Sequence, residues 1–181
     1  MKKLFLLIVC SILIPNLAFA QAGNIGIFAD SSGMSCDLNN TAGFLQLYIV
    51  HVNSPGVSGS QFRVGYYGAS LTYLGATSPF DNFLGEPMEG TAIGYNGCRV
   101  SPVHALTMSF FGISNNCDYF AIEKDPDAYP PGIYVTDCVT PVPNILSIAV
   151  GGRAFVNNDG SCPCDVPAEE TTWGQVKALY R

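Results

Sequence analysis

The chain has 181 residues and a formal net charge of −6, from eight Lys plus Arg and fourteen Asp plus Glu. This length fits one domain with a sizeable core. So few basic residues in an acidic chain provide no electrostatic route to nucleic acid or to an anionic membrane surface, and we expect neither as a partner.

The first twenty residues have the composition of a cleavable export signal. Two lysines precede the apolar run 4–14, and Ala18-Phe19-Ala20 forms a small-x-small cleavage site. The apolar run is too short to span a bilayer comfortably. We therefore expect residues 1–20 to be a signal peptide and the mature chain to begin at Gln21. The location would be secreted, extracellular or in the cell envelope, the periplasm included, with no membrane insertion after cleavage.

The mature chain has six cysteines, and an even number in an exported protein predicts three disulfides. The rival interpretation is a zinc site, but zinc usually takes Cys-x-x-Cys spacing, and the close pair here is Cys162-Pro163-Cys164 with no histidine near it. Of the fifteen connectivities we favour Cys98 with Cys138, because the strands after the first and before the second could pair antiparallel. The other two cysteines would then bond to the close pair. The cysteines expected to be oxidised are Cys36, Cys98, Cys117, Cys138, Cys162 and Cys164.

Short apolar stretches separated by Gly, Pro and Asn follow one another along the mature chain. Period-two alternation is clearest where Leu106, Met108 and Phe110 share one face. About ten such stretches, with no long helical period before residue 170, predict a single antiparallel β-sandwich of the Ig-like or jelly-roll kind. The expected strands are 24–28, 43–52, 61–66, 71–76, 91–95, 104–111, 119–122, 133–138, 145–150 and 154–156.

The joints between these stretches suggest local connections. Gly68 lies between 61–66 and 71–76, so we expect these two stretches to form a hairpin. The polar segment 77–90 contains two prolines, which predicts a long loop. The pair Asn96-Gly97 predicts a turn. The sandwich domain would occupy residues 21–165.

The last sixteen residues depart from the strand pattern. Thr172 and Gln175 form a capping box, and Trp173, Val176 and Tyr180 recur on one helical face. So short a helix does not persist alone in water. We therefore expect residues 166–181 to form a C-terminal capping helix packed on the sandwich through these three side chains. The alternative is a free tail that serves as a sorting or docking signal.

Catalytic residues are scarce. The mature chain has only two histidines, His51 and His104, both inside expected strands, and no Gly-x-Ser-x-Gly motif. Glu86, Glu89 and Glu123 are the carboxylates that could serve glycoside hydrolysis. We therefore favour a protein without enzymatic activity. The alternative is a small extracellular carboxylate-based hydrolase acting on glycan.

Two other groups of residues are candidates for binding. Tyr66, Tyr67 and Tyr129 are aromatic side chains in or beside polar segments and would suit a ligand surface. Asp125 and Asp127 are two residues apart, a spacing at which carboxylates can share a calcium ion, although no complete calcium loop follows. We predict no cofactor, with calcium as the one candidate, and no firm metal site.

Two stretches resemble known proteins. The ending 165–181, which reads Asp-Val-Pro-Ala-Glu-Glu-Thr-Thr-Trp-Gly-Gln-Val-Lys-Ala-Leu-Tyr-Arg and follows Cys-Pro-Cys, resembles the C-terminus of a set of uncharacterised secreted bacterial proteins. That resemblance implies export and a β-rich domain. In 45–77 a long strand, then Gly-Val-Ser-Gly-Ser-Gln-Phe-Arg-Val, then Leu-Thr-Tyr-Leu-Gly-Ala-Thr, is similar to the early strands of cohesin-like sandwiches. Cohesins bind dockerin modules, but no dockerin-contacting residue is matched here and six cysteines are unlike that family.

Together these features predict an exported, disulfide-stabilised and non-catalytic β-sandwich. It would act as a binding module for an extracellular protein or glycan, or as a structural component of the envelope or matrix.

Overall fold

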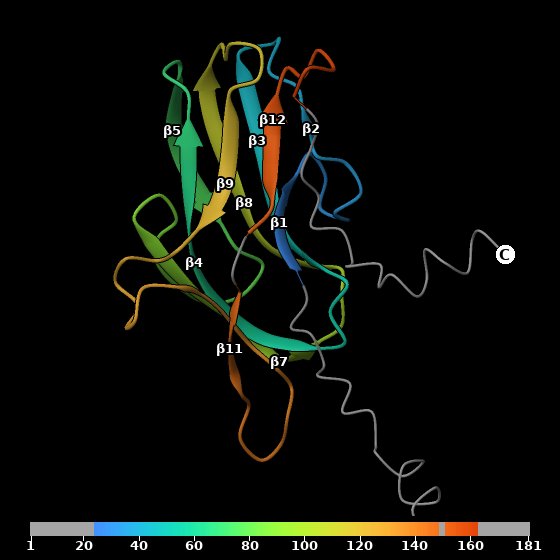
Figure 1. The fold of residues 1–181 in the computed structure, drawn as a ribbon, viewed down its shortest axis with the longest axis vertical. Helices are drawn as coiled ribbons and strands as arrows, with labels where there is room; N and C mark the ends of the chain where they lie inside the picture. Colours follow the sequence, from blue (N-terminus) through green and yellow to red (C-terminus); the bar gives the residue numbers. More distant parts are fainter. Residues whose placement is uncertain (1–23, 149–150, 163–181) are drawn as a thin grey trace, which may run out of the picture.

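The computed structural model describes residues 24–148 and 151–162 (Figure 1). Within these residues the chain forms strands and no helix, and none of it is a helix long and apolar enough to cross a membrane. The strands are β1 (Asn24–Phe28), β2 (Asp37–Leu38), β3 (Phe44–Val52), β4 (Val57–Tyr67), β5 (Leu71–Thr77), β6 (Asn82–Glu86), β7 (Gly90–Arg99), β8 (Val103–Gly112), β9 (Tyr119–Glu123), β10 (Ile133–Thr136), β11 (Ile145–Ile148) and β12 (Arg153–Val156).

Some sequence-based expectations concern segments outside the described residues. These are the signal peptide over residues 1–20, the oxidation of Cys164, and the capping helix over 166–181 with Trp173, Val176 and Tyr180. They stay predictions.

The strands form the two sheets of a β-sandwich. The smaller sheet has the order β1-β3-β8-β5. The larger has the order β11-β10-β4-β9-β12-β2, with β7 also pairing with β4 and carrying β6. The all-β sandwich predicted from the sequence is therefore present. Its strand pairs are antiparallel except for β12 with β2, which run parallel.

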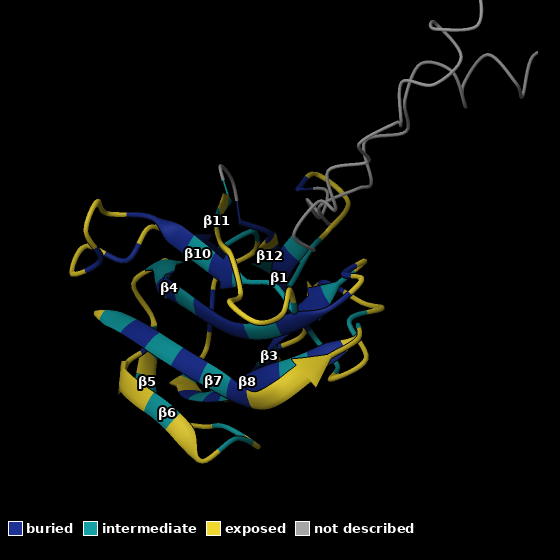
Figure 2. Cartoon of the chain, turned by 90° about the horizontal axis from the view of Figure 1, so that it is seen from below, coloured by how far each residue is buried: buried dark blue, intermediate teal, exposed yellow. Residues whose placement is uncertain are grey.

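Aromatic side chains join the two sheets in the core. Phe110 of β8 and Phe120 of β9 come from opposite sheets, and their ring centroids are 4.8 Å apart. Phe62 and Val64 point inward from β4, and both are fully buried. Burial of each such side chain contributes about 1.5–3 kcal/mol to folding. Exposed residues predominate along the edge strand β6 (Figure 2).

The strand β4 organises the larger sheet. Its first half lies between β7 and β10, where Gln61 is opposite Ala92 and Tyr134. Its second half pairs with β9, where Arg63 is opposite Glu123. Because side chains alternate along a strand, the side chains of Gln61 and Arg63 project from the same outer face of the sheet.

The expected hairpin between 61–66 and 71–76 is not formed. β4 pairs with β7, β9 and β10, whereas β5 pairs with β8 in the smaller sheet. The connection after Tyr67 therefore crosses from one sheet to the other. Both stretches alternate apolar and polar residues, a pattern that shows which face is buried but not which strand lies alongside.

Two other local expectations also differ from the structure. Segment 77–90 is not all loop, because it contains β6, an edge strand whose exposed residues give no alternating pattern. Asn96-Gly97 does not end a strand. Both residues have positive φ, 50° and 108°, and they lie at an irregularity inside β7 where the register with β4 shifts. A β-bulge uses the same residue types as a turn.

Two disulfides lie within the described residues, Cys98–Cys138 and Cys117–Cys162, and Cys36 is also disulfide-bonded. Cys98–Cys138 is the pairing favoured from the sequence, but the reason is different. The strand after Cys98 is β8 and the strand before Cys138 is β10, and these two do not pair because they belong to different sheets. The bridge passes over Gly56, where a Cβ would lie 2.9 Å from the Cys138 sulfur and 3.0 Å from the Cys98 sulfur.

Candidate functional site

Each of the two histidines forms a hydrogen bond with a hydroxyl group. His51 is completely buried, and its Nε2 lies 2.8 Å from the Tyr95 hydroxyl, which also bonds to Ser60. Burial raises the pKa of Tyr95, so its hydroxyl stays uncharged inside the core. His104 contacts the Thr107 hydroxyl at 2.9 Å, and partial burial lowers its pKa. Neither histidine lines one of the surface hollows described below.

The three candidate carboxylates lie on two different elements that flank β4. Glu86 and Glu89 are exposed at the β6–β7 turn, and the backbone carbonyl of Pro87 in that turn accepts a hydrogen bond from the Val64 amide of β4. Glu123 lies on β9, along the other edge of β4. β4 therefore lies between the turn that carries Glu86 and Glu89 and the strand that carries Glu123.

Asp125 and Asp127 differ in their surroundings. Asp125 is 2% exposed, and its carboxylate accepts hydrogen bonds from Gln61 Nε2 at 2.8 Å and from the Asp127 amide at 2.9 Å. Asp127 is exposed. Asp125 therefore fastens the β9–β10 loop onto the outer face of β4, a role that already uses both of its oxygens.

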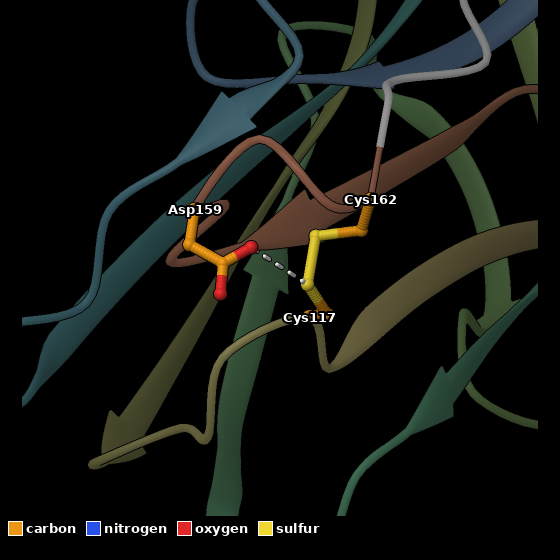
Figure 3. A group of neighbouring side chains, drawn as sticks. All are labelled: Cys117, Asp159 and Cys162. Atoms are coloured by element: carbon orange, nitrogen blue, oxygen red, sulfur yellow. Dashed lines mark hydrogen bonds between the residues drawn. A yellow bond between two sulfur atoms is a disulfide. The ribbon is translucent and has the colours of Figure 1, made fainter.

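One group of three side chains among the described residues has the spacing of metal ligands. Cys117, Asp159 and Cys162 have ligand atoms within 4.8 Å of one another. Figure 3 shows, however, that the two sulfurs are bonded to each other. Disulfide sulfurs carry no thiolate, the form that binds metal. The Asp159 carboxylate instead accepts a hydrogen bond from the Ser161 amide at 3.0 Å, so the group is structural.

The three candidate tyrosines do not lie on one surface. Tyr66 points toward the core, stacks on Phe120 and donates a hydrogen bond to Asp118. Tyr67, the next residue on β4, points outward and is 46% exposed. Tyr129 is fully exposed in the β9–β10 loop. Of the three tyrosines, only Tyr67 bonds to Glu123, which lines a hollow on the outer face of β4, β9 and β12.

Charged side chains surround a hollow of about 360 Å³ on the outer face of β4, β9 and β12, which we call the basic groove. Ala121 and Gly151, both small and buried, are among its lining residues. Strand register places Arg63 opposite Glu123, and Arg153 opposite Ala121, so side chains from three strands meet here. The charged residues that line the groove are Arg63, Glu123, Lys124 and Arg153.

Glu123 and Arg63 form an ion pair at one side of the basic groove. The Tyr67 hydroxyl also donates a hydrogen bond to Glu123, and this bond to a carboxylate raises the pKa of Tyr67. Gly65 lies between Arg63 and Tyr67 on β4, and a Cβ at this position would be 2.7 Å from the Glu123 carboxyl carbon. The glycine therefore leaves room for the carboxylate over the strand.

Arg153 occupies the other side of the basic groove. Its guanidinium carbon lies 5.8 Å from the centre of the Tyr119 ring, a cation–π arrangement. The ring of Tyr67 stacks on the same tyrosine, with centroids 4.5 Å apart and planes 10° from parallel. Because β4 and β12 flank β9 on opposite sides, Tyr67 and Arg153 approach Tyr119 from opposite sides.

A second hollow of about 310 Å³ lies on the outer face of β6, β7, β4, β10 and β11. We call it the apolar hollow, because Leu84 and Ile145 line it and are each 71% exposed. Gln61 also lines it, two residues before Arg63 on the same face of β4. The two hollows are therefore neighbours, and the Gln61–Asp125 hydrogen bond lies beside both.

None of Arg63, Lys124 and Arg153 was identified from the sequence as a candidate residue. The low number of basic residues was visible, but their convergence depends on the register of β4, β9 and β12.

No protein-family model matches the sequence, and no curated protein matches it. Two solved structures are similar in fold. A type II cohesin domain from the cellulosome of Acetivibrio cellulolyticus is 15% identical, with a TM-score of 0.52, over 75% of this chain and 95% of that one. A cohesin module from a family 33 glycoside hydrolase of Clostridium perfringens ATCC13124 is 11% identical, with a TM-score of 0.49, over 76% of this chain and 98% of that one. At such identity the likeness shows the fold alone, a cohesin-like β-sandwich.

Proposed function

We propose that this protein is a non-catalytic binding module of the extracellular space or cell envelope, and that it recognises a partner protein through the outer face of its larger sheet. The observation that carries the proposal is the pair of neighbouring hollows on that face. The apolar hollow exposes Leu84 and Ile145, and the basic groove lies two residues further along β4. An apolar contact area flanked by charged side chains is the usual composition of a protein interface.

The fold supports the same proposal. The resemblance of residues 45–77 to cohesin-like sandwiches implies a module that binds another protein, and the solved structure with a TM-score of 0.52 is a cohesin domain. Disulfides fit an exported chain, and cleavage after Ala20 would release it. The hydrolase alternative needs two converging carboxylates, and Glu86 and Glu123 are separated by β4.

Capture of a partner from the organism's own culture tests this function. Immobilised mature protein would be compared with the double variant L84D/I145D, which places charges in the apolar hollow. We expect the variant to lose the captured protein, because a buried unpaired carboxylate is costly at an interface. The matched control is Leu74→Asp, an exposed leucine (57%) on β5 of the smaller sheet. Equal capture by the double variant and the unmodified protein would contradict the proposal.

A further inference from the structure

The basic groove gathers most of the positive charge that the described residues of this acidic protein carry. Of the four Lys and Arg among the described residues, Arg63, Lys124 and Arg153 line it and only Arg99 lies elsewhere. One carboxylate, Glu123, lines the same groove. The groove therefore carries a local charge of about +2, whereas the whole chain has a net charge of −6.

The cations of the groove differ in their partners. Arg63 is paired with Glu123, and that carboxylate is held in place by the Tyr67 hydroxyl. Lys124 and Arg153 are exposed and form no ion pair with any described residue. Stacking on Tyr119 orients the Arg153 guanidinium without using its N–H groups as hydrogen-bond donors. These groups, together with the ammonium of Lys124, suit a carboxylate of a ligand.

We propose that the basic groove binds carboxylate side chains of an acidic segment of the partner protein. This inference rests on the proposed function and names the chemistry of the partner. Gln61 lines the apolar hollow and Arg63 lines the basic groove, on one face of β4, so a single partner can reach both. The partner segment would then combine apolar residues with Asp or Glu beside them.

The tyrosines favour a peptide over an acidic polysaccharide. A sugar ring binds to an aromatic side chain by stacking on an open ring face. Tyr67 approaches the Tyr119 ring from one side and Arg153 from the other. The ring therefore acts as a support for Arg153 instead of a platform for sugar.

The net charge of the chain does not prevent such binding at physiological salt. Charges further than about 8 Å from the ligand are largely screened under those conditions, so the nearby cations of the groove dominate. At low salt the acidic remainder of the protein contributes long-range repulsion. The affinity for an acidic segment should therefore decrease less with added salt than it would if the two local ion pairs were the only electrostatic contribution.

The test measures binding of a fluorescently labelled hexaglutamate peptide to the mature full-length protein, with a hexaglutamine peptide as the uncharged probe. We expect hexaglutamate to bind and hexaglutamine not to bind. The double variant K124Q/R153Q should weaken binding by about 2- to 25-fold, the range for two exposed ion pairs. The matched control Arg99→Gln removes the same kind of charge outside the groove and should leave binding unchanged.

Three results with peptide or saccharide probes would overturn the proposal, and one result of partner capture would do the same. The first is equal binding by the unmodified protein and K124Q/R153Q. The second is binding of oligogalacturonate but not hexaglutamate, which would assign the groove to a polysaccharide. The third is hexaglutamate binding only after E169Q/E170Q, which would show that the chain's own acidic ending occupies the groove. Partner capture that depends on Leu84 and Ile145 but not on Lys124 and Arg153 would leave the proposed function standing and this inference refuted.

Discussion

The carboxylate of Glu123 lies over the backbone of Gly65, at a place where a Cβ would be 2.7 Å from its carboxyl carbon. A residue with a Cβ would fit at this position only if Glu123 moved. The Glu123 carboxylate forms the ion pair with Arg63 and accepts the hydrogen bond from the Tyr67 hydroxyl. Because Gly65 has no Cβ, Glu123 can contact both Arg63 and Tyr67 at one side of the basic groove.

Gly65→Ala should therefore displace Glu123 and disturb its contacts. We expect a decrease of about 1–2 kcal/mol in the free energy of unfolding, because the added methyl group overpacks a site that is already in contact. Urea denaturation measures the change. The control is Gly94→Ala on β7, where the added Cβ would approach the Asn82 Cβ at 3.3 Å. Equal stability of G65A and the unmodified protein would show that Glu123 moves away at no cost.

Loss of the Cys98–Cys138 disulfide should lower stability substantially. The bridge joins residues 40 apart in sequence, and closing a loop of that length restricts the unfolded chain by about 4 kcal/mol. The double variant C98A/C138A is compared with the unmodified protein by urea denaturation under non-reducing conditions. Each single variant should show a similar loss and one titratable thiol. A free thiol on Cys98 in the unmodified, denatured protein would refute the assignment.

Acid should weaken the fold through His104. Partial burial lowers its pKa below the ordinary value of 6.5, so the folded state favours the neutral ring. The resulting stability is fully present above pH 6.5 and is lost as the pH falls from 6.5 through the folded pKa. The urea concentration at the unfolding midpoint is measured at about pH 7.5 and at about pH 5. Its decrease between these two pH values should be larger for the unmodified protein than for His104→Gln. Parallel pH profiles would count against this contribution, and capture of the partner should be unaffected in the variant.

The C-terminal segment should add stability to the sandwich. Trp173, Val176 and Tyr180 form an apolar stripe, and we propose that it packs on the domain as a short helix over 166–181. Burial of an indole and two neighbours contributes a few kcal/mol, so a chain that ends at Asp165 should melt at a lower temperature. Trp173 is the single tryptophan of the chain, so its fluorescence reports directly on this contact. A water-exposed indole and an unchanged melting temperature would support a free sorting or docking tail instead.

Most strands could be recognised from the sequence because the evidence for them is local. Leu106, Met108 and Phe110 alternate with polar residues, and the observed β8 buries these three. The edge strand β6 was missed for the corresponding reason, since a strand with exposed residues on both faces has no alternation. Asn96-Gly97 was interpreted as a turn because positive φ is favoured by the same residues in a turn and in a bulge.

Compartment, fold class and the scarcity of catalytic groups are properties of composition and spacing, and the sequence by itself determined what we expect of them. The sequence did not determine which strands pair with each other. Alternation in 61–66 and 71–76 marks a buried face, but which strand lies alongside depends on contacts distant in the chain, and the structure places β4 and β5 in different sheets. The basic groove has the same origin. Arg63, Lys124 and Arg153 are far apart in sequence, and only the register of β4, β9 and β12 brings their charges together, because pairing across a sheet is decided by tertiary packing.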